Sequence, residues 1–90
     1  NAAATLIAGQ QANTQVWNTP ITVDRAVTLS LTGAYAGAKF RIVRTAAATG
    51  AFNLNIGTGP LKAMGTAGSF CDVEYNGVTL AWMLTAYGTL

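Results

Sequence analysis

The sequence has no histidine, a single cysteine and very few charges. Of its 90 residues 9% are charged, and the net charge is +2; ordinary soluble domains carry about 25% charged residues. With no histidine and only Cys71, the chain cannot build the usual zinc or transition-metal sites or an internal disulfide. Serine–histidine and cysteine–histidine catalysis are excluded for the same reason. We therefore expect no metal and no other cofactor.

Other features that the sequence lacks exclude classes of binding partner. No apolar run reaches the roughly 18 residues of a membrane span, and none has the charged flank of a signal peptide, so we expect no membrane insertion. No cluster of Lys and Arg is available to bind phosphates, so nucleic acid is not an expected partner. The length predicts a single module over residues 1–90. Because the chain begins with Asn1 and not with methionine, we expect a piece of a longer protein.

Small residues dominate what is present. Alanine, threonine and glycine supply 17, 13 and 10 residues, although 51% of the chain is apolar. A domain of this size buries only about 60–65% of its extended-chain surface. With so few charges the remaining surface is unusually apolar for a monomer. This composition predicts an oligomer.

The apolar residues alternate with period two in short runs separated by glycine and asparagine, as in an all-β sandwich or barrel. In the N-terminal third, Val27, Leu29 and Leu31 predict one strand, and residues 5–7 and 14–18 predict short ones. We expect two stacked sheets of about three or four strands each.

The dipeptide Asn76-Gly77 predicts a two-residue type I′ hairpin. This turn sets Tyr75 opposite Val78, Val73 opposite Leu80 and Cys71 opposite Trp82. Upstream, a loop over residues 46–50 sets Ile42 opposite Leu54 and Phe40 opposite Ile56. The turn at 57–60 then sets Leu61 opposite Ile56 and Lys62 opposite Asn55. Residues 38–87 therefore read as an antiparallel meander of about five strands, with these side chains inward: Phe40, Ile42, Leu54, Ile56, Val73, Leu80 and Trp82.

The polar side of this meander is the first candidate site. Arg41, Asn53, Asn55 and Lys62 are predicted to gather there, and such groups hydrogen-bond sugar hydroxyls or clamp an acidic polysaccharide. Tyr35, in the glycine-flanked loop at 33–37, is a candidate platform for a sugar ring. Alternatively, these residues keep one face of the sheet solvated or form pairs across a subunit boundary.

Asp72 and Glu74 form the only close carboxylate pair. On a strand their Cα atoms lie about 6.6–6.8 Å apart on one face, and paired carboxylates carry out glycoside hydrolysis. The alternative is a solvated face, or ion pairing with Arg25 or with a neighbouring subunit. Cys71 reads as a small buried hydrophobe, because no base is available to activate it.

Five segments of the sequence occur in a familiar order, at residues 24–30, 38–45, 50–57, 59–62 and 71–77. Over residues 22–90 the chain resembles the C-terminal module of bacteriophage tailspike and tail-fibre proteins that carry a pectate-lyase-like parallel β-helix. The resemblance implies a homotrimer that caps and joins three chains in the virion tail, outside the cell. It implies no catalytic residue in this module, although the parent chain can be a polysaccharide-degrading enzyme.

The resemblance and the composition together predict a non-enzymatic trimerisation and capping module involved in host attachment. Phe70, Met83 and Tyr87, on the second face of the meander, are the predicted subunit interface. The main alternative is a module that binds a host surface polysaccharide at a fibre tip. A capsid-decoration protein and, more remotely, an enzyme are further alternatives.

Overall fold

The computed structural model describes residues 2–90, and this part of the chain is built of strands alone. These residues form no helix, and so they contain no helix that could cross a membrane. The eight strands are β1 (Ala4–Leu6), β2 (Thr14–Trp17), β3 (Arg25–Leu29), β4 (Lys39–Arg44), β5 (Leu54–Ile56), β6 (Lys62–Met64), β7 (Ser69–Asn76) and β8 (Ala81–Thr89).

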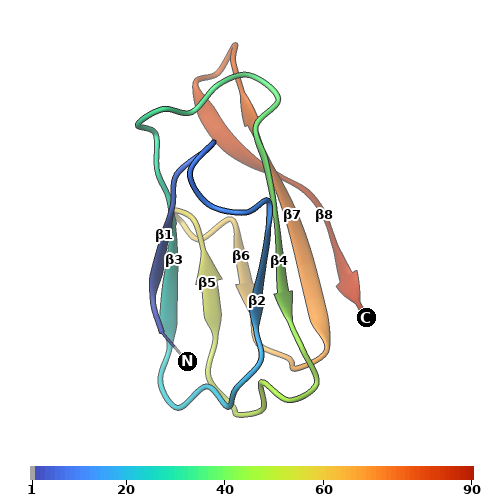
Figure 1. The fold of residues 1–90 in the computed structure, drawn as a ribbon. Helices are drawn as coiled ribbons and strands as arrows, with labels where there is room; N and C mark the ends of the chain where they lie inside the picture. Colours follow the sequence, from blue (N-terminus) through green and yellow to red (C-terminus); the bar gives the residue numbers. More distant parts are fainter. Residues whose placement is uncertain (1) are drawn as a thin grey trace.

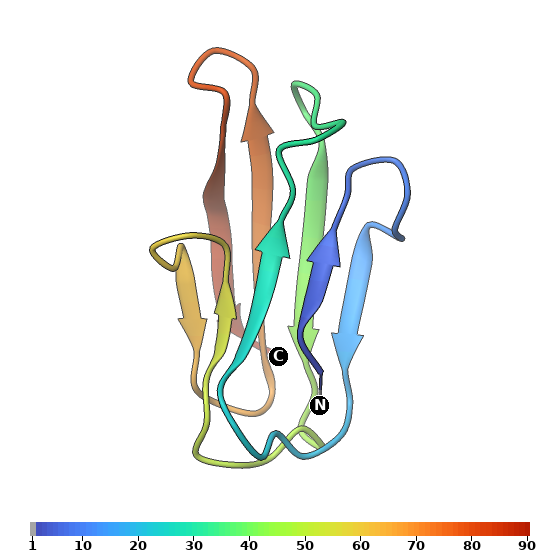
Figure 2. The same cartoon turned by 90° about the vertical axis from the view of Figure 1, so that its left-hand side faces the viewer.

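The strands form two four-stranded sheets that stack face to face (Figures 1 and 2). Sheet A has the order β1-β3-β5-β6 and sheet B the order β2-β4-β7-β8. The all-β sandwich predicted from the sequence is thus confirmed, but the meander is wrong. In the described chain only β5–β6 and β7–β8 are sequential strands that pair, and β1–β3, β2–β4 and β3–β5 are parallel. The other connections cross from one sheet to the opposite one.

A buried arginine explains why residues 46–50 do not close the predicted hairpin. Arg44 is completely buried at the end of β4. Its guanidinium donates hydrogen bonds to the carbonyl oxygens of Ala48 (2.8 Å), Gly50 (3.0 Å), Phe52 (2.8 Å) and Met64 (2.7 Å). Three of these carbonyls lie between β4 and β5, so this connection wraps around the guanidinium and crosses to sheet A. β4 therefore pairs with β7, where Ile42 lies opposite Cys71 and not opposite Leu54.

The predicted register of the β7–β8 hairpin is also wrong. Its loop has four residues, 77–80, and the side-chain oxygen of Asn76 accepts hydrogen bonds from the backbone N–H groups of Val78 (2.8 Å) and Thr79 (3.1 Å). Asn76 thus stabilises a longer turn through its side chain. The resulting pairs are Tyr75 with Trp82, Val73 with Leu84 and Cys71 with Tyr87.

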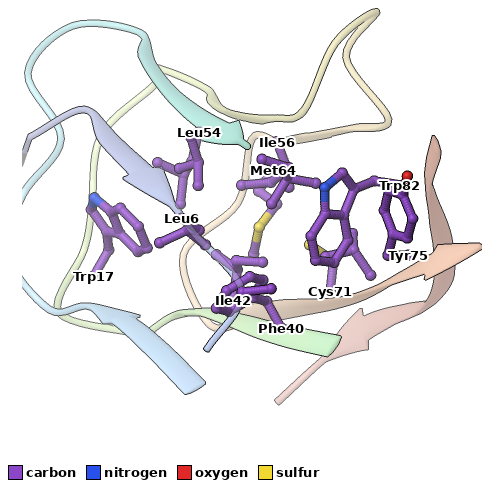
Figure 3. Close-up of a cluster of buried hydrophobic side chains, with 14 of the residues drawn as sticks. Leu6, Trp17, Phe40, Ile42, Leu54, Ile56, Met64, Cys71, Tyr75 and Trp82 are labelled. Atoms are coloured by element: carbon purple, nitrogen blue, oxygen red, sulfur yellow. The ribbon is translucent and has the colours of Figure 1, made fainter. Parts of the chain in front are cut away.

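The core fills the space between the sheets (Figure 3). Six of the seven predicted core residues are buried, but Leu80 is 65% exposed because it belongs to the longer loop. Trp82 packs against Phe40 and, edge to face, against Tyr75, with ring centroids 5.5 and 5.6 Å apart. Its indole N–H donates to the carbonyl oxygen of Ser30 at 3.1 Å. Between the hairpin loop and the bulge at Asp72/Val73 the register shifts by four residues, an even number, so Tyr75, Val73 and Trp82 keep their predicted inward side. Beyond the bulge the shift is five residues, and β8 there turns its other face towards the core side.

We predict that Arg44→Lys destabilises the fold, because three ammonium donors cannot satisfy four carbonyl acceptors in the same places. A buried polar group left without a partner costs about 1–3 kcal/mol. Urea unfolding should show a loss of this size or more. Arg41→Lys, at a half-exposed ion pair, is the matched control and should cost clearly less, because water compensates an exposed pair. Equal losses in the two variants would contradict the structural role given to Arg44.

We also predict that Cys71 makes stability decrease at high pH. The thiol is fully buried, and burial, assisted by the charge of Asp72, raises its pKa from 9.0 to about 11. Above about pH 9 the unfolded chain ionises this thiol while the folded chain does not, so the folded state loses stability as the pH rises from 9 towards 11. Denaturant unfolding should show this slope in the wild type, and Cys71→Ala should lack this component. Identical slopes would contradict the prediction.

Candidate functional site

Half of the charged residues of the chain lie on the outer face of sheet B. The side chains at 40, 42 and 44 of β4 point into the core, as do those at 71, 73 and 75 of β7. The residues between them therefore point outward. Four of the eight charged residues share this face, in the cross-strand pairs Arg41 with Asp72 and Lys39 with Glu74.

Arg41 and Asp72 form a bidentate ion pair on this face. Arg41 Nε lies 2.8 Å from Asp72 Oδ1, and Arg41 Nη2 lies 2.9 Å from Asp72 Oδ2. The hydrogen bond from Arg41 lowers the pKa of the Asp72 carboxyl, and the same contact raises the pKa of Arg41. The guanidinium also stacks on Phe70, with Cζ 5.0 Å from the ring centroid. The pair is partly exposed, so its remaining donors and acceptors are accessible to a ligand.

A polar groove of about 440 Å³ runs beside this ion pair. A β-bulge between Asp72 and Val73 shifts the register of β7 against β8 here, and the Thr85 hydroxyl donates to the carbonyl oxygen of Asp72 at 3.2 Å. Bulges often re-aim side chains beside binding sites. The groove presents an amide, two hydroxyls and charges of both signs from these residues: Asn13, Thr14, Lys39, Arg41, Asp72, Glu74 and Thr85.

The ion pair also bears on the hydrolase interpretation of Asp72 and Glu74. Asp72 pairs with Arg41, a partner that the sequence analysis did not consider for it. A carboxyl whose pKa is lowered is a poor general acid at neutral pH. Within residues 2–90, no three Cys, Asp or Glu side chains lie close enough together to hold a metal ion.

A second groove, of about 280 Å³, lies between β6 and the C-terminal part of β8. Lys62 Nζ lies 4.2 Å from the ring centroid of Tyr87, which is 61% exposed. Phe70, on the outer face of β7, lies opposite Gly88. A side chain at position 88 would begin 3.2 Å from the Phe70 ring, so the glycine leaves room for this aromatic.

The predicted glycan-binding residues do not gather in one place. Only Arg41 lines the groove on sheet B. Asn55 belongs to β5 in sheet A, and the backbone N–H of Asn53 donates to Asp24 at 2.7 Å. Lys62 lies opposite Ile56 and not opposite Asn55, a shift of one residue that moves it to the Tyr87 side. Tyr35 is exposed in the loop between β3 and β4.

The predicted interface residues divide in the same way. Phe70 and Met83 share the outer face of sheet B, and Met83 is 41% exposed. Tyr87, opposite Cys71 and beyond the bulge, lies on the other side of that sheet. Their role between subunits stays a prediction. The sequence reasoning missed Lys39, Asn13 and Thr85 as groove residues; the alternation in the segment at 39–44 already placed Lys39 on the face of Arg41.

Comparison with known proteins identifies one family. The chain matches the GW (Gly-Tryp) dipeptide domain over residues 1–87. No curated protein and no solved structure matches it. The sequence itself has no Gly-Trp dipeptide, since Trp17 follows Val16 and Trp82 follows Ala81. Both indoles are buried between the sheets and donate to backbone carbonyls, of Ala2 and Ser30. The match covers nearly the whole chain, which therefore belongs to the GW (Gly-Tryp) dipeptide domain family.

Proposed function

We propose that the chain is a non-enzymatic module that binds a cell-surface polysaccharide through the groove on the outer face of sheet B. The observation that carries this proposal is the bidentate Arg41–Asp72 pair beside an open groove. The bidentate pair fixes the positions of the donors and acceptors that it does not use, Arg41 Nη1 and the remaining lone pairs of the Asp72 oxygens, and these can hydrogen-bond sugar hydroxyls. Thr85 at the bulge, Thr14 and Asn13 add hydroxyl and amide groups to the groove.

Preorganisation supports the same proposal. Arg41 is held by Asp72 on one side and by the ring of Phe70 below it, so little side-chain freedom remains to be lost on binding. The groove is open and polar, which suits a hydrated polymer lying across the sheet. Membership of the GW family hints at cell-wall binding in general. A lowered pKa at Asp72 fits a binding role better than acid catalysis.

We predict that Arg41→Ala weakens polysaccharide binding by about tenfold or more, since hydrogen bonds from a charged group are among the stronger ones. An array of bacterial surface polysaccharides identifies the ligand, and titration calorimetry measures the loss. Lys62→Ala and Asn55→Ala are controls outside the groove and should keep wild-type affinity. Thermal melting shows that each variant is folded.

Two results would contradict this proposal. One is a wild-type chain that binds no polysaccharide on the array. The other is a loss in Lys62→Ala or Asn55→Ala that equals the loss in Arg41→Ala.

A second proposal is that the chain forms homotrimers that cap a phage tailspike or tail fibre in the virion. The resemblance to those modules supports it, and so does one feature of the structure. Residues 75–90 contain no acidic or basic side chain, yet Met83 is 41% exposed on the outer face of sheet B. Uncharged exposed apolar surface of this kind is typical of interfaces.

We predict that fusing the chain to an unrelated monomeric protein yields trimers, and that Met83→Asp weakens them by placing a charge in the interface. Val23→Asp is the control, because Val23 is 45% exposed and lies between β2 and β3. Sedimentation velocity reports the masses. Fusions of wild type and Met83→Asp with the same mass would contradict the role of Met83.

A further inference from the structure

The Arg41–Asp72 pair also bears on the class of polysaccharide that the groove takes. The sequence leaves two uses open for Arg41, which are to hydrogen-bond sugar hydroxyls or to clamp a carboxylate of an acidic polymer. Such a clamp needs two parallel N–H groups of the guanidinium. In the structure, Nε and Nη2 already make two such bonds, to the Asp72 oxygens at 2.8 and 2.9 Å. One edge of the guanidinium is therefore occupied by a carboxylate of the protein itself.

A carboxylate from a ligand would have to compete with Asp72 for this edge. Asp72 lies directly opposite Arg41 in the register of β4 and β7, so the backbone keeps the two side chains together. A partner held in this way has a high effective concentration. If it were displaced, Asp72 would stay beside the incoming carboxylate as a like charge without a partner, and like charges brought together oppose binding.

The rest of the groove gives an acidic ligand no compensating attraction. Its two cations, Lys39 and Arg41, are balanced by its two anions, Asp72 and Glu74, so the net charge of the groove is zero. The net charge of +2 of the chain is carried by residues outside the groove. A carboxylate bound to the free Nη1 of Arg41 would thus add a negative charge to a site whose cations are already neutralised.

Uncharged sugar hydroxyls meet no such penalty, because each hydroxyl can both donate and accept a hydrogen bond. The Lys39 ammonium and Arg41 Nη1 donate, and the carboxylates of Asp72 and Glu74 accept. The hydrogen bond from Arg41 lowers the pKa of Asp72, so this acceptor stays ionised at neutral pH. Donors and acceptors side by side suit neighbouring hydroxyls on one sugar ring.

We propose that Asp72 is a specificity-determining residue, which makes the groove select uncharged polysaccharides over polymers that carry carboxylate or phosphate groups. This inference rests on the polysaccharide binding proposed above and names the substrate class of that site. Asp72 acts by exclusion, because only an acidic ligand makes the repulsive contact with it. The same carboxylate contributes acceptors to a neutral ligand.

Matched pairs of ligands on the polysaccharide array test the selection. Each neutral polysaccharide is presented as it is and after oxidation of its primary hydroxyls to carboxylates, and each uronic-acid polymer also after reduction of its carboxyl groups. The wild type should bind the neutral member of a pair about tenfold more tightly or more, since the acidic member places like charges a few ångströms apart. Affinity for the neutral member should change little with ionic strength.

Asp72→Asn keeps the shape of the side chain but leaves the charge of Arg41 unneutralised. The preference for the neutral member should fall by about tenfold, and the affinity gained for the acidic member should decrease as salt is added. Asp24→Asn is the matched control. It removes the same charge at an exposed position outside the groove, where the side-chain oxygen can still accept the hydrogen bond from the backbone N–H of Asn53. This control should keep the wild-type preference, and thermal melting shows that both variants are folded.

The outcomes separate this inference from the function on which it rests. A neutral preference that Asp72→Asn loses and Asp24→Asn keeps supports the selection by Asp72. A wild type whose strongest ligand carries carboxylate or phosphate groups overturns the selection and leaves polysaccharide binding standing. A preference that is unchanged in Asp72→Asn, or that falls equally in both variants, overturns it as well. A wild type that binds no polysaccharide overturns both.

Discussion

The fold depends on how the Arg44 guanidinium is satisfied inside the protein. Its four recorded hydrogen bonds go to backbone carbonyls, three of them in the connection between β4 and β5. Burial lowers the pKa of Arg44 from its ordinary value, yet the four acceptors compensate for much of the lost hydration. By drawing this connection around itself, the side chain sends β5 to sheet A. β4 is then free to pair with β7, and this pairing creates the charged outer face of sheet B.

A scarcity of charge then divides the surface into distinct regions. The outer face of sheet B carries Lys39, Arg41, Asp72 and Glu74, while the loop 77–80 and the whole of β8 contain no acidic or basic side chain. The polar groove on sheet B and a cleft without charged side chains, lined by Leu29, Leu31, Leu61, Leu80 and Trp82, consequently lie on different parts of one small domain. A contact between copies through Met83 would share the outer face of sheet B with the groove, because Met83 lies opposite Glu74, a groove residue.

The sequence predicts the alternation within strands much better than the pairing between them. Period two placed Phe40, Ile42, Leu54, Ile56 and Val73 in the core, because burial of one face is a property of each strand alone. Pairing depends on groups distant in sequence. The Arg44 guanidinium donates hydrogen bonds to carbonyl oxygens as far along the chain as that of Met64, and the Asn76 side chain accepts a hydrogen bond from the four-residue loop. The prediction of the candidate site was incomplete for the same reason. Arg41 was found, and the alternation in the segment at 39–44 puts Lys39 on its face, but the partner Asp72 required the β4–β7 register.

The central claim, that Arg44 is a fully hydrogen-bonded buried cation around which the β4–β5 connection is ordered, can be measured directly. Nitrogen-15 NMR of the arginine side chains reports the exchange of guanidinium protons with water. The Nε–H and Nη–H protons of Arg44 should exchange far more slowly than those of the half-exposed Arg41, and four donor–acceptor couplings should reach the carbonyls of Ala48, Gly50, Phe52 and Met64. Exchange at Arg44 as fast as at Arg41 would contradict the account.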